Sequence, residues 1–367
     1  MARSSVPARP TSPQPNALGR RQFLGGAATG AAGLSMAAFL ASCTTNVSGS
    51  GSGGGAGGDF PSHTKWKFVF VNHVTTNPFF VPTQYGIQDA TSALGCTYQW
   101  TGSETSNVTE MVNAMNAAIS GKADGIAVAI TDPTAFNQPV ANALAAGIPV
   151  VSYNADAPAS SGNTRLAYLG QDLFASGVAV GERVVADVPS GDVVGFIATP
   201  GQLNIQPRID GIKSAIQASG KPINFVQIAT GAKVEDELSA IEAYYLGHKN
   251  VKGMYAVDAG STQGVGQIVQ KYNLAAAGVH SGGYDLLPTT LQLIQQGFLD
   301  FTIDQQPYQQ GFYPTIQLFL YKLSGGLSQP SNTNTGLLFI SKANVGPYLS
   351  STSRFEGSTA QQKVIAG

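Results

Sequence analysis

The sequence has little charge, because only 11% of its 367 residues are Asp, Glu, Lys or Arg and the formal net charge is −1 at pH 7. No basic stripe runs along it, which argues against a nucleic-acid-binding protein. Histidine is also scarce. His63, His73, His248 and His280 show no close metal-ligand spacing and have no accompanying Cys cluster, so we expect no bound metal.

Common catalytic and cofactor-binding motifs are missing as well. The chain contains no Walker phosphate loop and no Gly-x-Ser-x-Gly nucleophile elbow. Gly264-Val265-Gly266 lacks the third glycine of a dinucleotide-binding turn and does not directly follow a predicted strand, so we predict a role in helix packing. These absences argue against an enzyme and against a bound cofactor.

The N-terminal region is basic and weakly apolar. Arg20 and Arg21 precede a Gly/Ala-rich stretch that ends in Leu40-Ala41-Ser42-Cys43. This arrangement resembles a bacterial twin-arginine lipoprotein signal over residues 1–42, with a lipobox before the cysteine. The resemblance implies export, cleavage before Cys43, and a diacylglycerol group on its thiol that anchors the protein to the outer, periplasmic face of the cell membrane.

A membrane-spanning helix is the alternative interpretation, because Phe23 to Ser42 is about long enough to cross a bilayer. Its glycines, together with Thr29 and Ser35, make the segment too polar for a typical span. Gly19 and Gly25 depart from the usual residues around the paired arginines. The lipobox interpretation does not depend on those two positions.

Residues 43–63 form a candidate tether, since Thr44 to Gly58 is almost wholly Gly, Ser, Thr and Ala. Such a composition cannot bury enough apolar surface to offset chain entropy, so a flexible linker is predicted. With Cys43 in the anchor, Cys96 has no partner for an intramolecular disulfide. We expect Cys96 to be a small buried apolar group.

Beyond the tether, short β-branched or aromatic runs alternate with amphipathic segments of helix length. The predicted strands are 67–71, 125–130, 148–153, 193–198, 223–228, 253–257 and 301–303. The predicted helices are 81–94, 108–120, 134–146, 173–188, 209–219, 234–246, 262–272 and 287–296. Continuous apolar strands fit a parallel sheet covered on both faces. The sequence therefore predicts an α/β fold with doubly wound sheets.

Amides, carboxylates and aromatics follow the carboxyl ends of these strands, where open α/β sheets bind ligands. They occur in 75–80, 153–156, 284–285 and 304–307, and at Asp258. Aromatic faces cover the C–H surface of a polyhydroxylated ligand, and planar Asn, Asp and Gln groups bind adjacent hydroxyls. The pattern predicts such a ligand.

At these positions the chain resembles the ribose-type, type I periplasmic sugar-binding proteins that feed ABC importers. The likeness extends from about residue 65 to 348 and rests on motifs in a shared order: Asn77-Pro78-Phe79-Phe80, Gly147-Ile148-Pro149-Val150-Val151, Arg208-Ile209-Asp210-Gly211, Asp258, Gly283-Tyr284-Asp285 and Thr302-Ile303-Asp304-Gln305. The resemblance implies that the ligand cleft is lined by Asn77, Phe79, Phe80, Asn154, Arg208, Asp258, Asp285 and Gln305.

Within this set, the Arg208 guanidinium would give parallel hydrogen bonds to neighbouring hydroxyls, with Asp258 and Asp285 holding it in place. Simpler interpretations stay open. Arg208 could form a surface salt bridge at a helix start, and Asn77 could be a turn residue before a proline. Phe79 and Phe80 could be ordinary core.

Two departures from the family pattern bear on the ligand. Asn154-Ala155 stands where ribose binders have an Asp-Arg pair, which makes the pocket less charged and is compatible with a different sugar or an open-chain polyol. Ala232 falls where a second stacking aromatic is expected. Tyr153 or Tyr284 would then cover that face of the ligand.

The resemblance also implies two Rossmann-like lobes joined by a three-strand hinge. The crossings are expected near 170–172, 304–307 and 328–335. Lobe 1 would comprise 64–170 plus 306–330, lobe 2 would comprise 171–305 plus 331–350, and 351–367 would be a C-terminal tail. Ligand binding would then close the two lobes as a hinge motion.

The implied function is that of a lipid-anchored, monomeric solute-binding protein. It would capture a small neutral sugar or polyol, such as a pentose, hexose or alditol, and deliver it to an ABC permease. A sensor that presents the sugar to a membrane kinase or chemoreceptor is the alternative. A sugar-responsive repressor with the same fold is disfavoured, because an export signal occupies the place of its DNA-binding helices.

Overall fold

The computed structural model describes residues 60–362 and 364–365. Arg20, Arg21 and Cys43 lie outside the described residues, as does the tether up to residue 59. Within the described part of the chain, no helix combines the length and the apolar character that crossing a bilayer requires.

The described chain folds into two six-stranded sheets, each with the strand order of a doubly wound fold. The first, β11-β5-β4-β3-β1-β2, contains β1 (Lys67–Asn72), β2 (Thr97–Gly102), β3 (Gly125–Val128), β4 (Val150–Tyr153), β5 (Tyr168–Gly170) and β11 (Thr333–Asn334). The second, β12-β10-β9-β8-β6-β7, contains β6 (Gly191–Ile197), β7 (Ile223–Ala229), β8 (Gly253–Ala256), β9 (His280–Tyr284), β10 (Phe301–Asp304) and β12 (Leu338–Ser341). Strand pairs are parallel except β10 with β12. The predicted α/β fold is confirmed.

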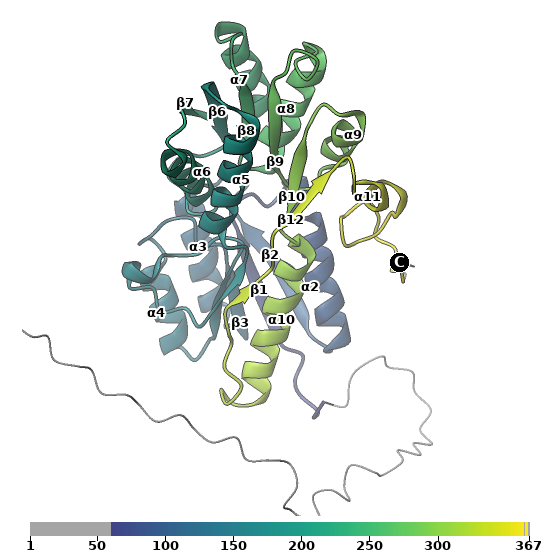
Figure 1. The fold of residues 1–367 in the computed structure, drawn as a ribbon. Helices are drawn as coiled ribbons and strands as arrows, with labels where there is room; N and C mark the ends of the chain where they lie inside the picture. Colours follow the sequence, from purple (N-terminus) through teal and green to yellow (C-terminus); the bar gives the residue numbers. More distant parts are fainter. Residues whose placement is uncertain (1–59, 363, 366–367) are drawn as a thin grey trace, which may run out of the picture. The chain divides into compact units, whose positions relative to one another are not determined.

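Helices pack on both sheets (Figure 1). The first sheet carries α2 (Val81–Ala93), α3 (Val108–Ser120), α4 (Asn137–Ala145) and α10 (Pro307–Leu323). The second carries α5 (Leu173–Asp187), α6 (Gln206–Ser219), α7 (Val234–Gly247), α8 (Ala259–Lys271) and α9 (Pro288–Gln296), while η2 (Pro78–Phe80), η3 (Ala159–Ser161) and α11 (Gly346–Ser350) are short. We call the first sheet with its helices lobe 1 and the second lobe 2.

Helix α10 was not predicted, because Gly311 and Pro314 interrupt its sequence. It forms because it packs closely on α2. A Cβ on Gly311 would lie 2.0 Å from the carbonyl oxygen of Thr83, and one on Gly86 would lie 2.1 Å from that of Tyr308. Tertiary packing here overrides a poor local propensity. Strands β2, β5, β9, β11 and β12 were also absent from the predicted set.

The Gly264-Val265-Gly266 segment packs inside lobe 2, as predicted. A Cβ on Gly264 would lie 2.7 Å from the Ile241 side chain of α7, and one on Gly266 would lie 2.8 Å from Leu293 of α9. Both glycines therefore allow α8 to approach its neighbouring helices.

The chain passes from lobe 1 to lobe 2 between β5 and α5, back to lobe 1 between β10 and α10, and to lobe 2 again between β11 and β12. The third passage differs from the expected boundary at residue 331. Thr333 pairs with Leu169 and Asn334 with Gly170, so this short strand belongs to lobe 1 and the passage follows residue 334.

After α11, which contacts α9 of lobe 2, the chain returns to lobe 1. Arg354 is only 6% exposed, forms an ion pair with Asp89 and donates to Gln88 Oε1 at 3.0 Å. Its guanidinium lies 4.7 Å from the ring centre of Tyr85. The C-terminal segment therefore links the two lobes once more, in addition to the three expected crossings.

Cys96 is the free cysteine of the described residues, and it is buried. Burial, and then the charge of Asp124, raises the pKa of its thiol to about 11. The residue is a packing group, as the sequence predicted.

Candidate functional site

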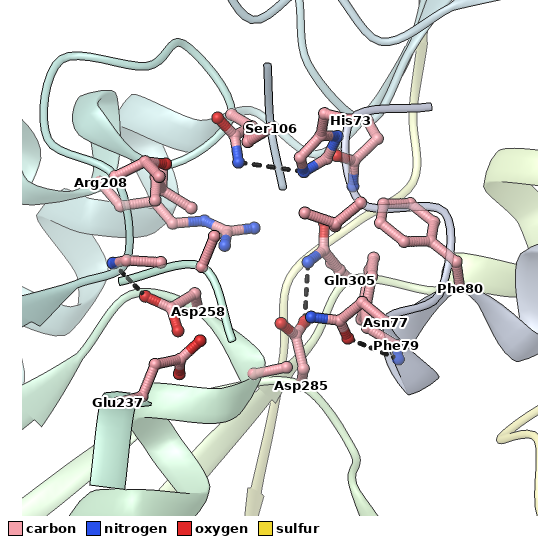
Figure 2. A pocket seen from close by; sticks show the side chains of 18 residues that line it. His73, Asn77, Phe79, Phe80, Ser106, Arg208, Glu237, Asp258, Asp285 and Gln305 are labelled. Carbon is pink, nitrogen blue, oxygen red and sulfur yellow. Dashed lines mark hydrogen bonds between the residues drawn. The ribbon is translucent and has the colours of Figure 1, made fainter. Parts of the chain in front are cut away.

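The carboxyl ends of β1, β4, β8, β9 and β10 lead into one cavity between the lobes, with about 530 Å³ of empty space including the part open to solvent. All of the residues predicted to line the cleft do line this cavity: Asn77, Phe79, Phe80, Asn154, Arg208, Asp258, Asp285 and Gln305. Figure 2 shows most of them around its centre.

On the lobe 1 side, Asn77 caps the short helix η2. Its Oδ1 accepts the backbone N–H of Phe79 at 3.0 Å, so the turn role considered from the sequence is present, and the residue lines the cavity too. The rings of Phe79 and Phe80 meet edge to face, with centres 4.7 Å apart. Phe80 is 1% exposed and belongs both to the core of lobe 1 and to the cavity wall. Phe80 therefore serves both as a core residue of lobe 1 and as part of the cavity wall.

Asn154 and Asp285 directly follow β4 and β9, and both have left-handed backbone, with φ of 61° and 77°. Non-glycine residues rarely adopt this conformation, and it often marks functional positions. The surroundings hold it in place, because the Asn154 amide donates to Gln310 Oε1 at 3.0 Å and the backbone N–H of Asp285 donates to the Ile303 carbonyl at 2.8 Å. Both side chains thereby face the cavity.

A hydrogen-bonded chain of amides connects the two lobes at this point. Gln305 Nε2 donates to Asp285 Oδ1 at 2.7 Å, and Gln310 Nε2 donates to Gln305 Oε1 at 3.1 Å. Gln310 in turn accepts from Asn154. Gln310 is fully buried and was missed because its helix, α10, was not predicted.

Arg208, in the first turn of α6, is 2% exposed and extends into the cavity (Figure 2), which excludes a surface salt bridge. Its Nη1 donates to the Val257 carbonyl at 2.7 Å and its Nη2 to Gln171 Oε1 at 3.1 Å. The guanidinium lies 4.0 Å from the ring centre of Tyr284.

The expectation that Asp258 and Asp285 hold Arg208 in place is therefore wrong. Among the described residues neither forms an ion pair with it. Its Nη atoms bind a backbone carbonyl and an amide instead, and the ring of Tyr284 flanks the guanidinium. Close helix packing fixes its backbone, since a Cβ on Gly177 of α5 would lie 2.2 Å from the carbonyl oxygen of Arg208.

Neither tyrosine expected to cover the ligand lies at the cavity. The Tyr153 hydroxyl accepts from Asn72 at 2.9 Å inside lobe 1, and the Tyr284 hydroxyl lies 3.1 Å from Ser176 Oγ beneath Arg208. Both are fully buried in the cores. The aromatic rings that line the cavity are therefore Phe79 and Phe80 of lobe 1, while lobe 2 presents Ala232.

Hydrogen bonds join the lobes across the rim of the cavity. His73 Nε2 accepts from Asn204 Nδ2 at 3.1 Å, and Gln202 Nε2 donates to the Ser106 carbonyl at 3.0 Å. The loop between β6 and α6 also donates from the backbone N–H of Leu203 to the Thr131 carbonyl at 2.9 Å. The structure thus has the lobes closed on each other.

Burial shifts several ionisable side chains of the cavity toward their uncharged forms, around the charged guanidinium of Arg208. Burial lowers the pKa of His73 to about 3, so the ring is uncharged. Burial raises the pKa of Asp285 to about 7, although the charge of Arg208 opposes this, and burial also raises the pKa of Asp258 and of Glu237. Carboxyls shifted in this way offer little negative charge to a cationic ligand.

Several buried polar atoms at the cavity have no hydrogen-bond partner among the described residues. They are His73 Nδ1, Asn204 Oδ1, Arg208 Nε and Glu237 Oε2. Buried polar groups are normally satisfied, so this set requires an explanation. His73, Ser106, Asn204 and Glu237 were not identified from the sequence, although His73 directly follows β1 and that position could have indicated it.

Comparisons with known proteins agree with this architecture. The model of the periplasmic binding protein domain matches residues 68–324. The xylose/arabinose-binding protein XylF of Sulfolobus acidocaldarius is 54% identical over 318 residues, which cover 83% of this chain and 78% of that protein.

Solved structures share the fold. An ABC transporter solute-binding protein from Burkholderia graminis, in complex with D-arabinose, has a TM-score of 0.71 and 23% identity, covering 80% of this chain and 100% of that one. Another solute-binding protein, from Agrobacterium vitis and bound with α-D-tagatopyranose, has a TM-score of 0.70 and 25% identity, covering 79% of this chain and 99% of that one.

Proposed function

This chain belongs to the periplasmic binding protein family, and from that premise we propose that it is the sugar-binding component of an ABC importer. The lobes close on one small neutral sugar or polyol and release it to the permease. Pentoses are the first candidates, because the relative with 54% identity is named for xylose and arabinose. A capture role of this kind needs micromolar affinity, about −8 kcal/mol.

The set of unsatisfied polar atoms at the cavity carries this proposal. Arg208 Nε is a donor, whereas Asn204 Oδ1 and Glu237 Oε2 are acceptors. A ligand rich in hydroxyl groups can satisfy both kinds, because each hydroxyl donates one hydrogen bond and accepts others. Phe79 and Phe80 offer apolar surface for the C–H face of the same ligand. The raised carboxyl pKa values disfavour a cationic substrate.

Thermal-shift screening tests this function directly. The protein is melted alone and with pentoses, hexoses and alditols, and with leucine and glutamate as ligands of another class. A sugar at 1,000 times Kd stabilises the folded state by about 4 kcal/mol, so at least one carbohydrate or polyol should raise the melting temperature by several degrees. If none does, the substrate class is wrong.

We further propose that the protein is exported and held at the outer face of the cell membrane through a lipid on Cys43, as a monomer. The lipobox-like sequence before Cys43 and the Gly/Ser-rich tether support this. Mass spectrometry of the membrane-extracted protein should find Cys43 as a lipidated N-terminal residue. Cys43→Ser should release the protein from membranes, and recovery of that variant in the membrane fraction would contradict the anchor.

A further inference from the structure

Glu237 is a buried acid on the lobe 2 wall of the cavity. It follows Glu235 and Asp236 in the first turn of α7, and these two are exposed whereas Glu237 is 2% exposed. Its side chain turns inward and lines the cavity together with Ala232 and Asp258 (Figure 2). Burial of a single member of an acidic run indicates a specific position for its carboxyl.

The neighbouring helix makes room for this carboxyl. Gly260 lies in the first turn of α8, and a Cβ at that position would lie 2.2 Å from Glu237 Oε2 and 2.8 Å from Oε1. Any larger residue at 260 would displace the carboxyl. The glycine and the glutamate therefore form a complementary pair beside the ligand cavity.

Asp258 completes the arrangement. Its Oδ2 accepts the backbone N–H of Ala198 and its Oδ1 that of Ser261, both at 2.9 Å. Burial, and then the charge of Asp258, raises the pKa of Glu237, whose carboxyl lies close to the side chains of Asp258 and Ser261. In the described part of the chain, Oε2 of Glu237 is buried and has no hydrogen-bond partner.

No hydrogen bond joins Arg208 to Glu237 among the described residues: the Nη atoms of Arg208 bind the Val257 carbonyl and Gln171, and its Nε has no partner. The side chain of Ala232 cannot donate a hydrogen bond to Glu237. At this end of the cavity lobe 2 thus presents a methyl group and an acceptor, where an aromatic ring was expected from the family pattern. An aromatic face recognises C–H surface, whereas an acceptor recognises a hydroxyl.

We propose that Glu237, supported by Asp258 and Gly260, is a specificity-determining residue whose Oε2 accepts a hydrogen bond from one particular hydroxyl of the bound sugar. The inference rests on the proposed sugar-binding function. It assigns the lobe 2 wall next to Ala232 to a hydroxyl-bearing part of the ligand. A sugar that lacks this hydroxyl leaves a buried acceptor unpaired and is rejected, as in other sites built around a substrate hydroxyl.

Calorimetric titrations of D-xylose and L-arabinose, and of their singly deoxygenated analogues, test the assignment. Removal of the hydroxyl that Glu237 binds should weaken binding to the wild type. The factor of this loss should be at least about ten times larger than the corresponding factor for Glu237→Ala. Glu237→Ala should bind the parent sugar at least about tenfold more weakly than the wild type does. It should bind the analogue that lacks this hydroxyl with an affinity within about twofold of that of the wild type. Glu237→Gln keeps a donor toward Asp258 and an acceptor toward the sugar, so it should retain the wild-type pattern.

Asp236→Ala is the matched control, because it removes an adjacent exposed acid of the same turn and should leave every affinity unchanged. If Glu237→Ala does not fold, Glu237→Asp withdraws the carboxyl by one methylene and should show the same loss of discrimination. Equal losses for the parent and all analogues, or no loss, would overturn the role of Glu237 while leaving sugar binding intact. Failure of the wild type to bind any of these sugars would overturn both this inference and the proposed pentose ligand, and the wider thermal-shift screen would then decide the substrate class.

Discussion

Asp285→Ala should lower sugar affinity by at least about 100-fold while the protein still folds. The carboxyl lies at the cavity, and among the described residues Gln305 donates to its Oδ1 while no hydrogen bond reaches its other oxygen, which can accept a ligand hydroxyl. Hydrogen bonds to charged groups contribute about 1.5–3 kcal/mol each. Loss of the acceptor also leaves Gln305 Nε2 without its partner. Calorimetry gives the affinity and circular dichroism the fold, and an unchanged affinity would remove Asp285 from the site.

The pH dependence of stability provides a control on the same residue. Burial raises the pKa of Asp285 to about 7, above the usual value near 3.9 of an unfolded chain. The folded, ligand-free protein therefore holds a proton that the unfolded chain has released. This stabilisation is present in full below about pH 4 and is lost as the pH rises through about 7.

Asparagine imitates the protonated acid. Asp285→Asn should therefore melt together with the wild type below about pH 4 and be more stable than it at pH 8, by up to about 4 kcal/mol if the lobes stay closed. Opening of the lobes rehydrates the carboxyl and reduces the difference. A difference in melting temperature that does not change with pH would show that Asp285 is not buried in the empty protein.

Arg208→Lys should reduce sugar affinity at least about tenfold, and Arg208→Ala should abolish measurable binding. The guanidinium is planar, holds the Val257 carbonyl and Gln171 at once, and stacks on Tyr284. A lysine ammonium cannot reproduce this geometry. Both variants should also melt at a lower temperature, because buried acceptors lose their donor.

Arg183 supplies the matched control for Arg208. It also lies on lobe 2 with its guanidinium 3.8 Å from an aromatic ring centre, that of Phe339, but it is not among the residues that line the cavity. Arg183→Ala should change the sugar affinity less than about twofold. Wild-type affinity in Arg208→Lys would contradict a bidentate role for Arg208.

Much of the site could be predicted because it depends on the order of strands. The carboxyl ends of parallel strands meet at one edge, so residues such as Asn154 and Asp285 are brought together wherever the strands are recognised. Some helices could also be predicted from their own sequence and the residue that caps them. The helix predicted over 108–120 forms as α3, with the Asn107 side chain accepting the backbone N–H of Glu110 at 3.2 Å.

Residues whose roles depend on tertiary packing could not be predicted. Glu237 belongs to an acidic run typical of an exposed helix start, and only the approach of α8 at Gly260 buries it. Gln310 lies in a helix that Gly311 and Pro314 obscure. The attachment of Arg208 to Val257 and Gln171, in place of the two acids, depends on how α6 lies against the sheet. No spacing in the sequence carries that information.

The buried thiol of Cys96 has a practical consequence. Maleimide dyes react with thiolates, and a buried thiol with a raised pKa gives almost none near neutral pH. Once Cys43 is lipidated or replaced, a cysteine introduced at the exposed Thr105, beside the contact between Ser106 and Gln202, would carry the dye alone. Fluorescence from that position would report lobe closure, so the Thr105→Cys variant could serve as a reagentless sugar sensor without removal of Cys96.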